Sequence, residues 1–228
     1  MRIAVIQHVL RASAEEDAVA LGNATADACD SGASVVILPA VPLLADMSDG
    51  DPVPGLFAAI GEERPDTIIL NPAVAPPGLN IATLPELGST ALIVGDAAMD
   101  YQEILTASGK KPGVAILVPQ SENGLQAEAM LELAIGLSQS LAGLVVIAET
   151  AGAAPGQAGH GGSAIVNLGE VVAEAMDEED ATLEFEVDSP VPQPEPRGLL
   201  PEIPTILSQR LANHEGVKPD AGYPADLN

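Results

Sequence analysis

Apolar and polar positions alternate along the first two thirds of the chain in a strand-then-helix order. Short β-branched apolar runs, typical of buried strands, occur at RIAVIQ, SVVILP, DTIILN, TALIVG and GVAILVP. Between them, apolar residues recur every three or four positions, which predicts helices at SAEEDAVALGNATADACDSGA, VPGLFAAIGEER, AAMDYQEILTASG and about residues 122–141. The proline-rich stretch PAVAPPGLNIATLPELGS leaves room for at most one short strand. This order predicts a sheet covered by helices.

The first predicted helix has a clear start and a clear buried face. Ser13 and Glu16 have the spacing of a capping box. The predicted core stripe is Ala18, Leu21, Gly22, Thr25, Ala28 and Cys29. Cys29 therefore falls on this buried stripe and far from any strand end. A buried thiol keeps a high pKa, so we expect Cys29 to be structural.

From Gly143 onward the pattern changes to consecutive strands, at LVVIAE, SAIVNL, EVVAEAM and ATLEFEV. Two mixed sheets packed face to face, with helices outside, would accommodate both halves of the chain. We therefore predict an α/β fold, a four-layer α-β-β-α sandwich, over residues 1–188. Residues 189–228 are predicted to form a proline-rich linker and an arm with one short helix.

The long helix predicted at 122–141 has an unusually wide apolar face. It carries one row of Met130, Leu133, Ala134, Leu137 and Leu141, and a second of Leu131 and Ile135. Such a face suits a helix that meets both a sheet and another helix.

Composition narrows the classes of partner. The 228 residues include two Phe, two Tyr and no Trp, so the core must be aliphatic. There are 33 acidic against 8 basic residues, a net charge of −25, which excludes nucleic acid and anionic membrane surfaces as partners. The acidic excess fits either solubility, for example in a salty or acid-rich cytoplasm, or a docking face for a basic partner.

The chain gives no sign of export, membrane insertion or a multi-cysteine site. The opening MRIAVIQH lacks the long apolar stretch of a signal peptide, and the most apolar region is interrupted by polar residues. We therefore expect a cytoplasmic protein. A single cysteine excludes an intrachain disulfide and any multi-cysteine metal site.

Several segments together resemble the nitrilase (carbon-nitrogen hydrolase) superfamily. They are MRIAVIQ, DSGASVVILPA, GLSQSLAGLVVIAETAG and GQAGHGGSAIVNLGEVVAEAMDEEDATLEFEVD, with LLPEIPTILSQR resembling the family's C-terminal arm. The match covers roughly residues 1–210. The resemblance implies an α-β-β-α sandwich that pairs through its helices into a dimer. It also implies catalysis by a Glu base, a Lys that stabilises the oxyanion and a Cys nucleophile.

All three catalytic roles are vacant where the resemblance would place them. The family's LPE-like motif reads LPA here, so the place of the base is Ala40. Gly95 stands at the nucleophile's turn, and the segment that should supply the lysine contains none. Ala40 and Gly95 are thus vestigial triad positions, and the sequence favours a pseudoenzyme.

Three other residues are candidates for ligand contacts. Asp96 follows Gly95 and is predicted to cap the next helix, His160 lies in a glycine-rich loop, and Glu86 lies near the shortened lysine segment. The acidic run MDEEDATLE lacks the spacing of a calcium loop, and the three histidines are too scattered for zinc. We expect no metal and no cofactor.

Three functions are compatible with these residues. The first is a non-catalytic nitrilase-like protein that acts by assembly, as a homodimer or docked on another protein. The second is a binding module that keeps the old pocket for a small amide, nitrile-like or carboxylate metabolite. The third is an amidase with relocated residues, which needs a nucleophile that the sequence does not reveal.

Overall fold

The structure is a computed structural model that describes residues 1–41, 52–72, 75–152, 159–175 and 179–187. The predicted linker and C-terminal arm lie outside these described residues. Within them, no helix combines the length and the apolar character needed to cross a membrane.

One sheet is built around the first strand. Strands β1 (Arg2–Val9), β2 (Val35–Ile37) and β3 (Ile68–Leu70) run parallel in that order. Strand β11 (Ala181–Glu186) pairs antiparallel with the other edge of β1. The two-residue β8 (Thr150–Ala151) pairs with the carboxyl end of β1, His8 opposite Thr150.

The second sheet has six strands, in the order β10-β9-β7-β6-β5-β4. Its parallel centre is β5 (Gly88–Val94), β6 (Val114–Val118) and β7 (Leu144–Ile147). Antiparallel strands complete it, with β4 (Gly78–Leu84) at one edge, and β9 (Ala164–Asn167) and β10 (Glu170–Glu174) at the other.

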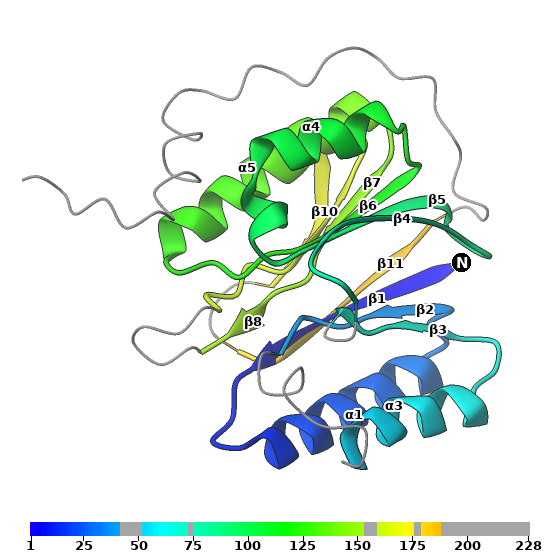
Figure 1. Ribbon diagram of the computed structural model, residues 1–228. Coiled ribbons are helices and arrows are strands. Elements are labelled where there is room, and N and C mark those ends of the chain that lie inside the picture. The colour runs from blue at the N-terminus through cyan, green and yellow to red at the C-terminus, as the bar shows by residue number, and fades with distance from the viewer. Residues whose placement is uncertain (42–51, 73–74, 153–158, 176–178, 188–228) are drawn as a thin grey trace, which may run out of the picture.

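Helices cover the outer face of each sheet (Figure 1). Helices α1 (Ala14–Asp30) and α3 (Pro52–Glu63) lie on the five-stranded sheet. The 3-10 helix η2 (Gly95–Met99) and helices α4 (Tyr101–Gly109) and α5 (Gly124–Leu141) lie on the six-stranded sheet. The predicted four-layer α-β-β-α sandwich with two mixed sheets is confirmed.

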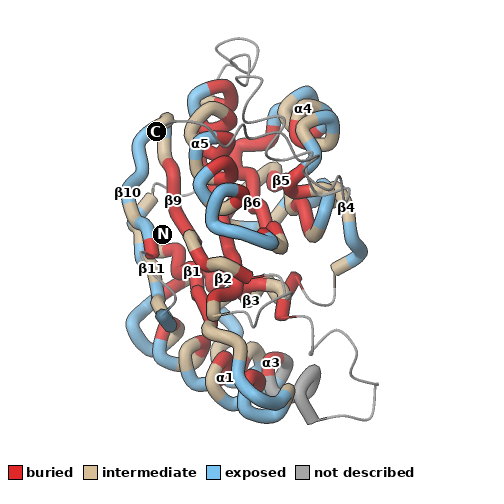
Figure 2. The backbone as a smooth tube through the Cα atoms, turned by 90° about the vertical axis from the view of Figure 1, so that its left-hand side faces the viewer, coloured by how far each residue is buried: buried red, intermediate tan, exposed pale blue. Residues whose placement is uncertain are grey.

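Both faces of the central strands are buried, which explains their continuous apolar runs. In β1, Ile3 and Val5 belong to the core between the sheets, whereas Ala4 and Ile6 pack toward α1. Along α5, the predicted row Met130, Leu133, Ala134, Leu137 and Leu141 is buried against the six-stranded sheet. Figure 2 shows this buried interior with exposed outer helix surfaces.

Local signals placed the start of α1 correctly and the start of α5 within two residues, but the helix predicted at AAMDYQEILTASG is divided into η2 and α4. Ser13 caps α1 by accepting a hydrogen bond from the Glu16 backbone N–H, as predicted. The long helix begins two residues later than expected because Asn123 caps it and accepts the Gln126 N–H.

The proline-rich stretch contains one strand, as allowed, but β4 is seven residues long rather than short. Its prolines do not interrupt the ladder: Pro72, Pro76 and Pro77 precede the strand and Pro85 follows it. A proline within β4 would have removed a backbone donor.

Candidate functional site

The carboxyl ends of the parallel strands from both sheets meet at one end of the sandwich. The link is visible in Ser163, whose backbone N–H donates to the Gln7 side chain at the end of β1. The hydroxyl of Ser163 bonds the backbone of Glu149, which lies two residues after the end of β7. Because parallel strands place their carboxyl ends at the same edge, β2 and β5 also end here, and Ala40 and Gly95 follow them.

Ala40 offers only a methyl group at this end. It is half-buried and packs against the core between the sheets, which includes Val94 at the end of β5. No proton can be taken up at this position, so it contributes no general base.

Gly95 has the geometry of a special turn. Its φ is +71°, a left-handed conformation that costs side-chain-bearing residues about 1–2 kcal/mol. A Cβ added there would meet nothing within 4 Å. The turn is therefore open to a side chain, and glycine leaves it without a nucleophile.

Cys29 lies at the opposite end of its sheet. Its thiol is beside the hydroxyl of Thr67, which precedes β3 and so marks the amino end of the parallel strands. The prediction that Cys29 lies far from any strand end is wrong, because it is beside Thr67 next to the start of β3, and it is half-buried rather than buried. Burial nevertheless raises the pKa of the thiol, as expected for an unreactive cysteine.

The lysines do not reach the strand ends either. Lys110 follows the last turn of α4, and Lys111 leads into β6, so both lie at the amino end of that strand. Lys218 lies outside the described residues. The described part of the chain thus brings neither lysine nor cysteine to the carboxyl ends of the strands.

A buried carboxylate occupies this end instead. Glu149 is 1% exposed, and its carboxylate accepts the Ser121 backbone N–H at 2.7 Å and the Ser121 hydroxyl at 3.1 Å. The backbone N–H of His160 is a further donor. Burial raises the pKa of Glu149 to about 7, although these hydrogen bonds act in the opposite direction.

This carboxylate belongs to a network that joins the two sheets. The backbone of Glu149 bonds the Ser163 hydroxyl, and the Ser163 N–H donates to Gln7, whose side-chain amide in turn donates to the Glu179 carbonyl at 3.0 Å. Ser121, Glu149 and Ser163 are all buried. The network can hold or release one proton near neutral pH, but Ser121 is too buried to attack a substrate.

The predicted contact residues are not gathered together. His160 is half-buried and reaches the Glu149 network through its backbone. Asp96 is exposed in η2 and does not cap α4, because Asp100 does so by accepting the Gln102 N–H. Glu86 lies in the β4–β5 turn, at the other end of β5 from Gly95, a separation of about 20 Å for a seven-residue strand.

A second polar cluster lies on the other face of β1, beneath α1. His8 Nε2 is 2.6 Å from Asp17 Oδ1, and His8 Nδ1 is 3.5 Å from Asp180 Oδ1. Asp180 also pairs with Arg11. Asp17 is fully buried, and its Oδ2 has no hydrogen-bond partner among the described residues.

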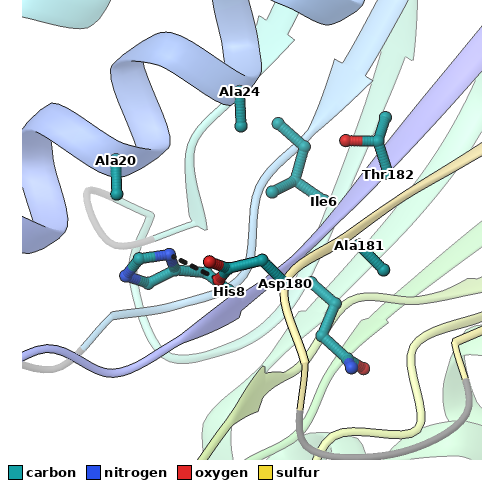
Figure 3. A pocket seen from close by; sticks show the side chains of 8 residues that line it. Ile6, His8, Ala20, Ala24, Asp180, Ala181 and Thr182 are labelled. Atoms are coloured by element: carbon teal, nitrogen blue, oxygen red, sulfur yellow. Dashed lines mark ion pairs between the residues drawn. The ribbon is translucent and has the colours of Figure 1, made fainter.

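A cavity of about 140 Å³ opens beside this cluster (Figure 3). Its polar lining residues are Gln7, His8, Asp180 and Thr182, and its apolar lining residues are Ile6, Ala20, Ala24 and Ala181. No group of histidine, cysteine and acidic residues within the described ranges could hold a metal ion.

Sequence reasoning missed both clusters. Glu149 carried a usable signal, because it directly follows the apolar run LVVIA, as a polar residue at the carboxyl end of a buried parallel strand. The pairing of His8 with Asp17 had no signal in the sequence, because it depends on how the turn between β1 and α1 folds back.

Comparisons with known proteins match this fold. No family model and no curated protein sequence matches the chain. Among solved structures, the amidase from Nesterenkonia sp. AN1, with acrylamide added at its active-site cysteine, is 14% identical with a TM-score of 0.64. The alignment covers 82% of this chain and 93% of that one.

Two further structures of that amidase agree. The form without its His-tag gives a TM-score of 0.63 and 14% identity, over 82% of this chain and 93% of that one. A mutant in complex with butyramide gives a TM-score of 0.62 and 15% identity, over 82% of this chain and 90% of that one. That amidase belongs to the nitrilase superfamily, so the fold of this chain is nitrilase-like.

Proposed function

We propose that this chain is a degenerate member of the nitrilase superfamily that lacks covalent amide chemistry and acts as an assembly or subunit partner through oligomerisation. The observation that carries the proposal is the pair of strand ends at Ala40 and Gly95. The fold that would present a base and a nucleophile is retained, yet it presents a methyl group and a hydrogen.

The position of the one cysteine supports this proposal. A covalent route needs the nucleophile and its base within hydrogen-bond reach. Cys29 lies at the amino end of its sheet, with a raised pKa, whereas the open turn at Gly95 lies at the carboxyl end of the other. Hydrolysis through a cysteine therefore has no agent at the site.

The α4–α5 layer supplies the proposed dimer face. Leu125 is 54% exposed at the start of α5, and Leu131 and Ile135 are only partly buried where they pack against the core. Leu131 and Ile135 are the second apolar row that the sequence predicts for this helix. Pairing of two such layers would bury these side chains.

The test combines two measurements on the purified chain. Sedimentation should show a dimer, and ammonia release from acrylamide or butyramide should stay at the buffer rate. Leu125→Glu should convert the dimer to monomer, whereas Val19→Glu should leave it intact. Val19 is a matched control, because it is 55% exposed on α1. A chain that is monomeric at all concentrations, or that hydrolyses either amide, contradicts the proposal.

One observation favours small-molecule binding as a second candidate. A Cβ at Gly95 would meet nothing within 4 Å, and Ala40 offers only a methyl group, so neither residue fills the space that a triad side chain would take. A ligand present at 100 times its Kd stabilises a protein by about 2.7 kcal/mol. A thermal-shift series with acrylamide, butyramide and their carboxylates should then raise the Tm, and a flat series removes this candidate.

A further inference from the structure

The hairpin of β9 and β10 exposes an unusual amount of apolar surface. Of the large hydrophobic side chains that are exposed in the described residues, three fall within five positions: Leu168 at 59%, Val171 at 39% and Val172 at 38%. Scattered exposed apolar residues are normal, but a local concentration indicates a contact surface. We name Leu168, Val171 and Val172 the hairpin patch.

Leu168 is unfavourable for the fold in two respects. It is a large apolar side chain in solvent, and its φ is +53°. Bulky residues at positive φ are outliers, and turns of this hand favour Asn followed by Gly. Gly169, at φ +87°, satisfies the second position, but leucine at the first costs about 1 kcal/mol or more. Such strain is found where a residue serves something other than stability.

The turn is held rigidly in this conformation. The Gly169 N–H donates to the Ser138 hydroxyl at 3.0 Å, and the Leu168 N–H donates to the Gly143 carbonyl at 3.3 Å. A Cβ on Gly169 would lie 2.3 Å from the Gln139 side chain, so the hairpin packs tightly on the end of α5. A partner would meet a preformed surface, which reduces the entropy lost on binding.

Strand β10 also presents a sheet edge. It is the last strand of the six-stranded sheet, and no strand of the described residues pairs with its outer edge. Its register shifts between Val171 and Ala173, so Val172 sits in a bulge and both valines are exposed. An exposed edge with apolar side chains can accept an extended segment of another chain.

The charges around the valines bear on whether the edge of β10 binds a second copy of this chain or a different protein. Glu170 and Glu174 are exposed on either side of the valines. Two copies of β10 paired antiparallel around Val172 would set Glu170 of one copy opposite Glu174 of the other, twice. Like charges directly opposite each other are destabilising, so this edge disfavours pairing with its own copy.

We propose that the hairpin patch docks an extended segment of a different protein, in which basic residues flank an apolar centre, by addition to the edge of β10. Leu168 anchors the segment, and Glu170 and Glu174 pair with its basic residues. This inference rests on the proposed role in assembly and names a surface for it that is separate from the α4–α5 layer.

The probe is the synthetic peptide KKTVTVTKK, titrated into the full-length ¹⁵N-labelled chain, with EETVTVTEE as the charge-reversed control. The lysine peptide should shift the amide signals of residues 168–174, and the glutamate peptide should bind about tenfold more weakly or worse. Absence of these shifts, or equal affinity of the two peptides, overturns the proposal.

Leu168→Asn separates docking from folding. Asparagine suits the left-handed turn, so this variant should be at least as stable as the original while binding the lysine peptide about tenfold more weakly. Val19→Asn should not change binding. If Leu168→Asn binds the lysine peptide with unchanged affinity, the proposal is overturned. It is also overturned if Leu168→Asn converts a dimer to a monomer, because the hairpin patch would then bind a second copy of this chain. A monomeric chain that still binds through β10 keeps this inference and removes only the proposed dimer.

Discussion

Replacing Glu149 with glutamine removes a buried acid and keeps its shape and most of its hydrogen bonds. Glutamine can still accept the Ser121 N–H through its carbonyl oxygen, and its amide can donate to the Ser121 hydroxyl. What changes is the proton, which glutamine neither gains nor loses. The substitution therefore isolates the cost of ionising this group in the interior.

The magnitude follows from the pKa of about 7 against an ordinary value of 4.5. The folded chain binds the proton more tightly than the unfolded chain, so the free energy of unfolding falls as the pH rises between these two values. At 1.36 kcal/mol per pKa unit, the loss is about 3 kcal/mol, complete above pH 7. Below pH 4.5 the carboxyl is neutral in both states and has no such effect.

Urea unfolding from pH 4.5 to 8.5 measures this effect. The difference in free energy of unfolding, Glu149→Gln minus the original chain, should rise with pH by about 3 kcal/mol, because all other groups titrate in both proteins. Glu170→Gln, an exposed site on β10, reports the effect of removing one charge from the acidic surface. A difference that is flat, or that falls with rising pH, refutes the reasoning.

Four further substitutions test other parts of the structure. Gly95→Cys should fold with a loss of about 1–2 kcal/mol from its positive φ, and its thiol should react with acrylamide while no amide is hydrolysed; sustained turnover would contradict the vacant site. His8→Ala should cost about 1–3 kcal/mol in urea unfolding, because it removes the contact of His8 with the fully buried Asp17 carboxylate and leaves that carboxylate with the Arg11 backbone N–H; an unchanged free energy of unfolding would show that the contact is unimportant. Gly143→Ala should destabilise strongly, because its Cβ would lie 2.5 Å from a backbone carbonyl oxygen, whereas Gly61→Ala in α3 meets open space and should stabilise by about 0.5–1 kcal/mol; equal thermal shifts for the two would contradict this.

The fold was predictable because its signals are local. Short β-branched runs indicate the buried strands, and capping residues such as Ser13 indicate where helices begin. The length of β4 was harder to predict, because it depends on where the prolines lie relative to the hydrogen-bonded strand and not on how many there are.

The site was predictable only in part. The resemblance predicts Ala40 and Gly95 as triad positions, and this stays a prediction; the structure shows that both follow strands that end on the same side of the sandwich. The hydrogen bonds of the Glu149 network could not be predicted from the sequence, because Gln7 and Ser163 are 156 residues apart and meet only when the two sheets pack. Asp96 failed as a cap because η2 intervenes before α4 begins at Tyr101.

The pairing of β1 with β11 affects how the chain can fold during synthesis. Arg2 lies opposite Glu186, and Gln7 lies opposite Ala181. One edge of β1 therefore stays unpaired until β11, near the end of the described residues, has been synthesised. At translation rates of about 5–20 residues per second, that wait is roughly 10 to 35 s. Throughout it, the apolar strand that will become the centre of a sheet has an open edge. The five-stranded sheet is therefore expected to close late, after helices α4 and α5 have had time to form on their own strands.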